Sequence, residues 1–258
     1  MSIEVEPEWW KSCFDEVYLI TDARSVCNPN ITSLEVDLIC RLLKLRPDNR
    51  VLDLCGGHGR HCIELYRHGI THCTLLDYSP YLINRAKEST WEQGMEIDCV
   101  RADARHTGLP SNSFNDVIIM GNSLGYGNEP GWDLSILQES RRLLCTGGYV
   151  LVDVVDGSCL KKSFNPNTWH EIGEDIIVCR QRELMQNRIN TREIVLSRTT
   201  GLLRDHTYSI FFYEPVSLKS LLESAGFTDT EIHTNFSPHQ LKGDYGCMNN
   251  RMIGTGRK

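Results

Sequence analysis

A short hydrophobic segment that ends in a glycine-rich turn constrains this chain more than any other stretch. It reads VLDLCGGHGRH from Val51 to His61 and contains Gly56, Gly57 and Gly59. Glycine accepts a positive φ and lets a ligand approach the backbone closely. A helix that starts after the turn offers unpaired N–H groups to an anion. The pattern therefore predicts a strand, a tight turn and a helix start that can hold a ligand.

Two kinds of cofactor turn fit this geometry to different degrees. A dinucleotide site needs G-x-G-x-x-G and an acidic residue about 20 positions later. Gly57 and Gly59 supply the first two glycines, but Cys62 stands where the third is expected. The other kind has an acidic residue four positions before the first of two glycines, and Asp53 occupies that position. The missing glycine disfavours the dinucleotide turn.

The composition is that of an ordinary globular chain with a slightly acidic balance. The 258 residues are 40% hydrophobic, and 27 Lys and Arg against 34 Asp and Glu give a net charge of −7. An acidic chain is a poor match for duplex nucleic acid, which usually requires a basic face. No stretch approaches the roughly 18 apolar residues of a membrane span, and the N-terminus lacks the order of a signal peptide. We expect one cytoplasmic domain with no membrane contact.

The eleven cysteines indicate reduced thiols. None forms a C-x-x-C pair, and most lie in apolar segments, where a free cysteine packs as a small hydrophobic residue. Their spacing does not suit zinc, so no metal site is expected. Cys55, inside the glycine turn, is the thiol best placed to touch a ligand.

Strands and helices alternate after the first 30 residues. A helix capped by Ser33 is expected to run to Leu45, and further strands are expected at 72–77, 97–102, 114–120 and 149–154, with helices at 60–68, 79–91 and 132–144. This alternation predicts an α/β, doubly wound, mostly parallel sheet. Ligands bind at the carboxyl edge of the strands in such sheets. The polar loop 121–127 follows a central strand at that edge.

Acidic residues close two of the expected strands. Asp77 follows Asp53 by 24 positions, about one βαβ step, where a carboxylate meets ribose hydroxyls. Tyr78 can lie against an adenine face. Asp103, after the third strand, can accept from an adenine amine or cap a helix. These residues would join the glycine turn around one nucleoside.

Two segments flank this core. Residues 3–19 carry Trp10, Phe14 and Tyr18 at helical spacing, which predicts a helix. This helix either covers the sheet edge or forms a lid within residues 1–30, and Pro29 and Asn30 are expected to break the chain after it. Strands expected at 175–184, 189–197 and 202–213 form an inserted antiparallel layer over 165–213. That layer either extends the sheet, provides a dimer surface or covers an acceptor pocket. A helix at 215–225 and an antiparallel pair at 228–236 and 247–256 complete a seven-stranded sheet.

Taken together, the chain resembles the class I S-adenosylmethionine (SAM) dependent methyltransferases over nearly its whole length. Six motifs in order carry the resemblance: VLDLCGGHGRH (51–61), LLDYSPYLINRAKE (75–88), RADAR (101–105), FNDVIIMGNSLGY (114–126), LLCTGGYVLVD (143–153) and LLESAGF (221–227). Four positions depart from the family pattern: Cys55 for a glycine, Cys145-Thr146 for Lys-Pro, and Asn115 for an acid. No Asn-Pro-Pro-Tyr signature follows the fourth strand, which disfavours base-amino and glutamine methyltransferases.

The resemblance implies a Rossmann-like fold, SAM as cofactor and S-adenosylhomocysteine as product. It also implies a role for each matching position: Gly57 and Gly59 against the methionyl part, Asp53 supporting the turn and the amino group, Asp77 on the ribose, Tyr78, Asp103 and Ala104 around the adenine, the Met120 carbonyl facing the amine, and Tyr18 in the lid.

The expected function is methyl transfer to the nitrogen or oxygen of a small molecule, mainly by in-line positioning. A hydroxyl acceptor would benefit from a base. The candidates are His58, Tyr126, His206 and Tyr208, and none is assigned as catalytic. The alternatives are an NAD(P)-dependent Rossmann oxidoreductase and a SAM-binding module without turnover. A homodimer is compatible with the sequence.

Overall fold

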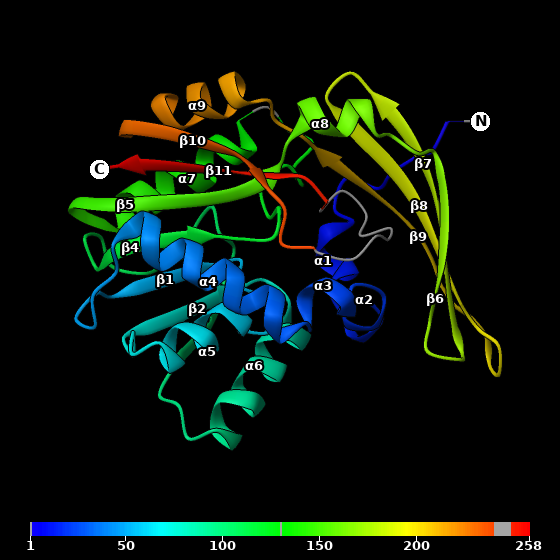
Figure 1. The fold of residues 1–258 in the computed structure, drawn as a ribbon, viewed down its shortest axis with the longest axis horizontal. Coiled ribbons are helices and arrows are strands. Elements are labelled where there is room, and N and C mark those ends of the chain that lie inside the picture. Colours follow the sequence, from blue (N-terminus) through cyan, green and yellow to red (C-terminus); the bar gives the residue numbers. More distant parts are fainter. Residues whose placement is uncertain (1, 130, 240–248) are drawn as a thin grey trace.

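A seven-stranded sheet forms the centre of the molecule (Figure 1). The computed structural model describes residues 2–129, 131–239 and 249–258. The strand order is β10-β11-β5-β4-β1-β2-β3, and β11 runs antiparallel to both of its neighbours while the others are parallel. This confirms the predicted mostly parallel sheet with an antiparallel last strand. The strands are β1 (Val51–Leu54), β2 (Cys73–Asp77), β3 (Asp98–Arg101), β4 (Phe114–Ile119), β5 (Leu144–Val155), β10 (Thr228–Phe236) and β11 (Arg251–Arg257).

Helices cover both faces of this sheet, as a doubly wound fold requires. On one face, Leu52 and Ile119 share a buried cluster with residues of α7 (Trp132–Leu143) and α9 (Pro215–Ser224). On the other face, Ile118 and Leu151 pack with residues of α4 (Pro29–Leu43), α5 (Arg60–Arg67) and α6 (Pro80–Glu92). Burial from both sides explains why β1 and β4 are nearly continuous hydrophobic runs.

A separate four-stranded antiparallel sheet interrupts the alternation, as predicted for residues 165–213. Three of its strands were predicted to within two residues at each end: β7 (Ile176–Met185), β8 (Arg188–Ser197) and β9 (Gly201–Phe211). The strand β6 (Asn167–Ile172) and the helix α8 (Gly157–Lys162) were not predicted. Half of β6 is exposed polar or aromatic surface, so its hydrophobic signal is weak.

A backbone hydrogen bond connects the inserted sheet to the loop that follows β4 of the central sheet. Phe211 N–H donates to the Gly125 carbonyl at 2.7 Å. Gly125 has φ +98, and a Cβ there would lie 2.2 Å from the Phe211 carbonyl oxygen. Only glycine therefore allows this approach. Figure 1 shows the inserted sheet standing beside the N-terminal helices at one end of the molecule.

The N-terminal segment departs from the expected single helix over 3–19. It forms three short helices, α1 (Trp10–Cys13), α2 (Glu16–Thr21) and α3 (Ala23–Val26). The break before α2 has a local cause, because the Asp15 carboxylate accepts from the Tyr18 N–H and starts a new helix. Ahead of α1, Ile3 N–H donates to Glu183 Oε2 at 2.8 Å, so this segment reaches the inserted sheet.

Two further boundaries correct the sequence interpretation. Pro29 and Asn30 do not break the chain: Pro29 is the first residue of α4, and Asn28 rather than Ser33 caps that helix. The last strand was expected over 247–256. Cys247 lies outside the described residues, and the strand begins at Arg251. No helix in the described ranges is both long and apolar enough to cross a membrane.

Candidate active site

A cavity of about 970 Å³, open solvent at its mouth included, lies at the carboxyl edge of the parallel strands. The glycine turn, the ends of β2 and β3, the loop after β4 and the N-terminal helices form its walls. Seven of the nine predicted cofactor residues line it: Tyr18, Gly57, Asp77, Tyr78, Asp103, Ala104 and Met120. The structure thus gathers residues separated by about a hundred positions around one space.

Asp77 connects the end of β2 to the glycine turn. Its Oδ2 accepts from Gly57 N–H at 2.8 Å and its Oδ1 accepts from Ser79 N–H at 2.8 Å. Burial raises the pKa of Asp77, and these backbone donors oppose the rise. A carboxylate has about four acceptor sites. Asp77 can therefore hold the turn and still accept from two hydroxyls in the cavity.

Asp53 and Gly59 do not line the cavity and act from behind it. Asp53 is fully buried under the turn, where a Cβ on Gly56 would lie 2.5 Å from its carboxyl group. Gly59 has φ +83, and a Cβ there would lie 3.3 Å from Ala86 and Leu75. Asp53 supports the turn, and Gly59 lets the turn lie close to α6 and β2.

Burial raises the pKa of Asp53 to about 7, above its usual 3.8. A carboxyl group whose pKa is raised by folding stabilises the protein fully below its unfolded pKa and loses that contribution as pH rises through the folded value. We expect Asp53→Asn to gain stability relative to wild type by about 3 kcal/mol between pH 4 and pH 7. Urea unfolding of both proteins across this range measures the difference. A difference independent of pH would contradict the prediction.

An aromatic wall closes the side of the first cavity. Trp10 lies 4.8 Å from Tyr78 and 5.5 Å from Trp132, centroid to centroid. The Arg105 guanidinium lies 3.5 Å from the Trp132 ring centroid and pairs with Asp103 at 2.6 Å. Burial opposes ionisation of Asp103, but the hydrogen bonds from Arg105 outweigh it and lower its pKa. Trp10 and Trp132 were not predicted as cavity residues, although Trp10 was placed on the lid face.

A second cavity adjoins the first and lies between the N-terminal helices and the inner face of the inserted sheet. It encloses about 900 Å³, again with open solvent included. Six residues line both cavities: Phe14, Tyr18, Val26, Arg60, Gly121 and Tyr126. These shared walls mark the place where a ligand in one cavity can meet a ligand in the other.

Five aromatic side chains, here called the aromatic cluster, surround this junction: Trp9, Phe14, Tyr18, Tyr126 and Tyr208. Trp9 is central, with centroids 5.1 Å from Tyr126 and 5.7 Å from Tyr208. Phe14 lies 5.0 Å from Tyr18 and stacks on Tyr126 at 5.5 Å. All five line the second cavity. The cluster joins α1 and α2 to the loop after β4 and to β9.

The inserted sheet presents a row of charged side chains to the second cavity. Arg180, Glu193 and His206 are direct neighbours across β7, β8 and β9. Arg180 Nε donates to Glu193 Oε2 at 2.7 Å, and His206 Nε2 lies 3.4 Å from Glu193 Oε1. Asp22 of the N-terminal segment lies 3.4 Å from Arg180. Burial opposes ionisation of Glu193, but His206 and Arg180 lower its pKa to about 2.

The four candidate bases fall into different places. His58 lines only the first cavity, and burial with Arg60 nearby lowers its pKa to about 4. Burial raises the pKa of Tyr126 and Tyr208, so both phenols hold their protons at neutral pH. His206 lies in the second cavity beside a carboxylate that can orient its ring.

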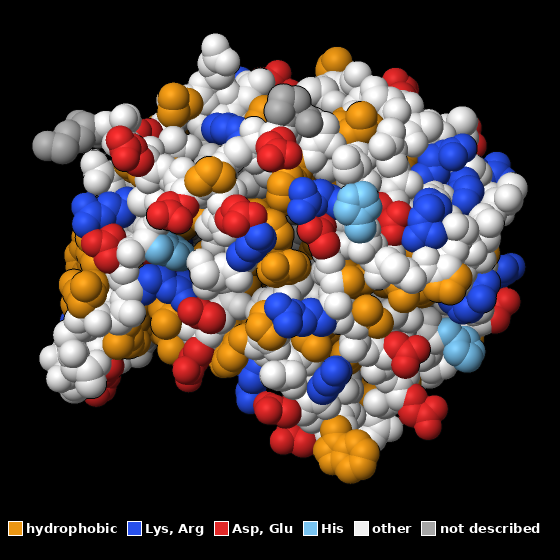
Figure 2. Space-filling model, turned by 180° about the vertical axis from the view of Figure 1, so that it is seen from behind, with side chains coloured by type: hydrophobic (Ala, Val, Ile, Leu, Met, Phe, Trp, Pro, Cys, Tyr) orange, Lys and Arg blue, Asp and Glu red, His pale blue; other side chains and the backbone are white. Residues whose placement is uncertain are grey.

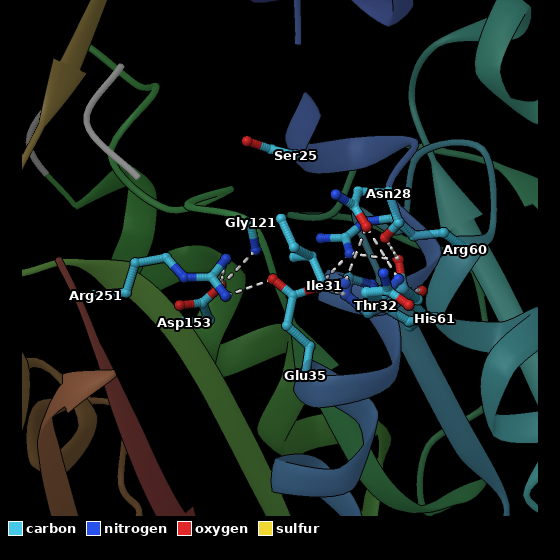
Figure 3. Close-up of polar contacts among 12 residues, drawn as sticks. Ser25, Asn28, Ile31, Thr32, Glu35, Arg60, His61, Gly121, Asp153 and Arg251 are labelled. Carbon is cyan, nitrogen blue, oxygen red and sulfur yellow. Dashed lines mark hydrogen bonds and ion pairs between the residues drawn. The ribbon is translucent and has the colours of Figure 1, made fainter. Parts of the chain in front are cut away.

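A buried ion network, drawn in Figure 3, borders both cavities. The Glu35 carboxylate of α4 contacts Arg60, His61 and Arg251, and it is fully buried. Asp153 pairs with Arg251 at 2.9 Å and accepts from Gly121 N–H at 2.9 Å. Burial opposes ionisation of Glu35, yet Arg60 and Arg251 hold its pKa well below the usual value. This network was not predicted, because its one local signal is a Glu inside the hydrophobic stripe of α4.

The strand order and the glycine turn held by an acid at the end of β2 are those of the Rossmann-like methyltransferase fold. Residues 51–148 match the family model described as a methyltransferase domain. This match supports the resemblance to the class I SAM-dependent methyltransferases that the sequence motifs predicted, a class whose cofactor is SAM. No curated protein sequence matches the chain.

Solved structures share the fold over nearly the whole chain. A SAM-dependent methyltransferase from Clostridium acetobutylicum matches with a TM-score of 0.75 and 14% identity, over 95% of this chain and 99% of that one. The CcbJ methyltransferase from Streptomyces caelestis gives 0.74 and 16%, over 95% and 96%. A sugar N-methyltransferase from Streptoalloteichus gives 0.67 and 18%, over 100% and 98%.

Proposed function

We propose that this enzyme transfers the methyl group of SAM, bound in the first cavity, to a small molecule bound in the second. The main observation behind this proposal is that Phe14, Tyr18, Gly121 and Tyr126 line both cavities. Holding a donor and an acceptor in line lowers the barrier by proximity alone. The sulfonium of SAM supplies an activated methyl group. The protein's task is to align the acceptor and to exclude water.

The residues of the first cavity fit SAM. Asp77 keeps acceptor sites for the two ribose hydroxyls, and Tyr78 with Trp10 offers aromatic faces to the adenine. Asp103 and the Ala104 N–H lie at the adenine edge. The backbone of Gly57, the Met120 carbonyl and Tyr18 border the methionyl end. Asp53 and Gly59 support the turn from outside the cavity.

A small acceptor suits the second cavity because two segments enclose it. Residues 1–30 provide the lid, and the sheet within 165–213 provides the opposite cover. Both belong to one methyltransferase domain that spans the chain. Among the similar structures are a sugar N-methyltransferase and a toxoflavin-precursor N1-methyltransferase with its small substrate bound.

The surface and the thiols support a cytoplasmic enzyme without a nucleic acid partner. On the face drawn in Figure 2, acidic and basic side chains are interspersed, and hydrophobic ones gather between them near the middle. The ten cysteines in the described ranges are all free thiols. Reduced cysteines are typical of the cytosol. A homodimer stays a prediction, which light scattering would test.

A bulky substitution in the second cavity tests whether methyl transfer can be blocked without loss of cofactor binding. Ile210 lines the second cavity and not the first. We expect Ile210→Trp to bind S-adenosylhomocysteine within about twofold of wild type and to lose at least about 90% of methyl transfer from labelled SAM to a pool of small metabolites. Leu203→Trp adds the same bulk to an exposed position of β9 and serves as the control.

Calorimetric titration with S-adenosylhomocysteine and with NADH tests the cofactor directly. Binding of the first alone supports the proposal. Binding of NADH alone would overturn it, as would full transfer activity in Ile210→Trp.

A further inference from the structure

We infer that the second cavity selects an amine and holds it as an ammonium ion between the aromatic cluster and the Asp22–Glu193 carboxylates. The inference rests on the proposed function for the place of the acceptor. It adds the chemical class of the acceptor, which the sequence left open between nitrogen and oxygen.

The aromatic cluster provides the first argument. Aromatic rings attract cations through their electron-rich faces, and cages of such rings recognise methylated ammonium groups. Phe14, Tyr18 and Tyr126 border both cavities, and Trp9 and Tyr208 extend the cluster into the second. Methylation of an amine moves a positive charge from sulfur to nitrogen. A cluster at the junction stabilises that charge on both sides of the transfer, whereas an ether product carries no charge.

The charge balance of the second cavity provides the second argument. Asp22 and Glu193 share one guanidinium, that of Arg180. The other charged side chains that line the cavity are paired: Arg204 with Asp15, and Glu35 with Arg60 and Arg251. Arg251 also pairs with Asp153, which lies outside the cavity lining. Counting no histidine, the group formed by Asp22, Arg180 and Glu193 carries one negative charge in excess. A bound ammonium ion would neutralise it.

The third argument is a route for the proton that the amine must lose. An ammonium has no lone pair, so it must lose a proton before it attacks the methyl group. Glu193 lies beside His206 Nε2, which favours a proton on that nitrogen and leaves Nδ1 to accept another. The amine lone pair then forms the new N–C bond while the C–S bonding pair returns to sulfur. The product is a methylated ammonium, a neutral thioether and a protonated His206.

Choline and its uncharged carbon isostere, dimethylbutanol, test the cation preference without knowledge of the acceptor. Both are titrated calorimetrically into the enzyme saturated with S-adenosylhomocysteine. We expect choline to bind about tenfold more tightly than the isostere. Asp22→Asn should remove most of this preference, and Ile210→Trp should abolish binding of choline. Equal affinities for the two probes, or a preference unchanged in Asp22→Asn, would overturn the inference.

The role of His206 has a separate readout. Choline has no N–H proton to lose, so His206→Asn should bind it within about twofold of wild type. The same variant should lose methyl transfer to amines in the metabolite pool. Retained transfer would exclude the proton route. The inference and the proposed function can fail separately. If S-adenosylhomocysteine does not bind, the proposed function fails; if it binds but choline is not preferred, only the inference fails.

Discussion

Replacement of Asp77 by alanine is expected to weaken the binding of S-adenosylhomocysteine by about a hundredfold or more. In the proposed complex, the ribose hydroxyls would lose their hydrogen bonds to the carboxylate. Hydrogen bonds to a charged group contribute about 1.5–3 kcal/mol each. The glycine turn would also lose an anchor, because Asp77 Oδ2 accepts from Gly57 N–H. Both losses fall on the same ligand, so we expect this to be the largest single effect on cofactor affinity.

Two matched variants make the Asp77 experiment decisive. Asp77→Asn keeps one carbonyl oxygen and should fall between wild type and alanine. Asp98→Ala changes an exposed acid at the start of β3, far along the strand from the cavity, and should bind as wild type. Calorimetry on all four proteins measures the series, with urea unfolding to verify that each is folded. Affinity within threefold of wild type in Asp77→Ala would contradict the assignment of the ribose site.

The motifs made the first cavity predictable because each of its main contacts is local in sequence. A strand end, a glycine turn and the acid one βαβ step later are fixed by the topology of a parallel sheet. A motif does not show, however, whether a residue lines the cavity or lies behind its wall. Asp53 and Gly59 match the motif as well as Asp77 does, yet they lie behind the cavity wall.

The second cavity was less predictable because its parts come from distant segments. The row of Arg180, Glu193 and His206 exists only once β7, β8 and β9 take their register. His206 was a candidate base in the sequence, but nothing local pointed to Glu193 as its partner. Similarly, Asp15 and Asn28 act as helix caps through side-chain contacts, and these divide the N-terminal segment differently from its hydrophobic periodicity.

The Glu35 network gives the second large prediction. Glu35→Ala is expected to lower the free energy of unfolding by about 3–5 kcal/mol, because Arg60 and Arg251 would remain buried without their shared carboxylate. Glu35→Gln keeps the shape and removes the charge, so it should also destabilise, by a smaller amount. Urea unfolding at pH 7 measures all three proteins. Asp37→Ala, at an exposed position two residues along the same helix, is the control.

The Glu35→Gln variant also tests whether the ion network supports ligand binding. Arg60 lines both cavities, and Arg251 reaches Gly121 through Asp153, so Glu35 holds two walls of the junction in place. We therefore expect Glu35→Gln to weaken S-adenosylhomocysteine and choline together, by similar factors. A variant that loses stability but keeps both affinities would show that the network serves folding alone. A loss of choline binding alone would place its effect on the acceptor side of the junction.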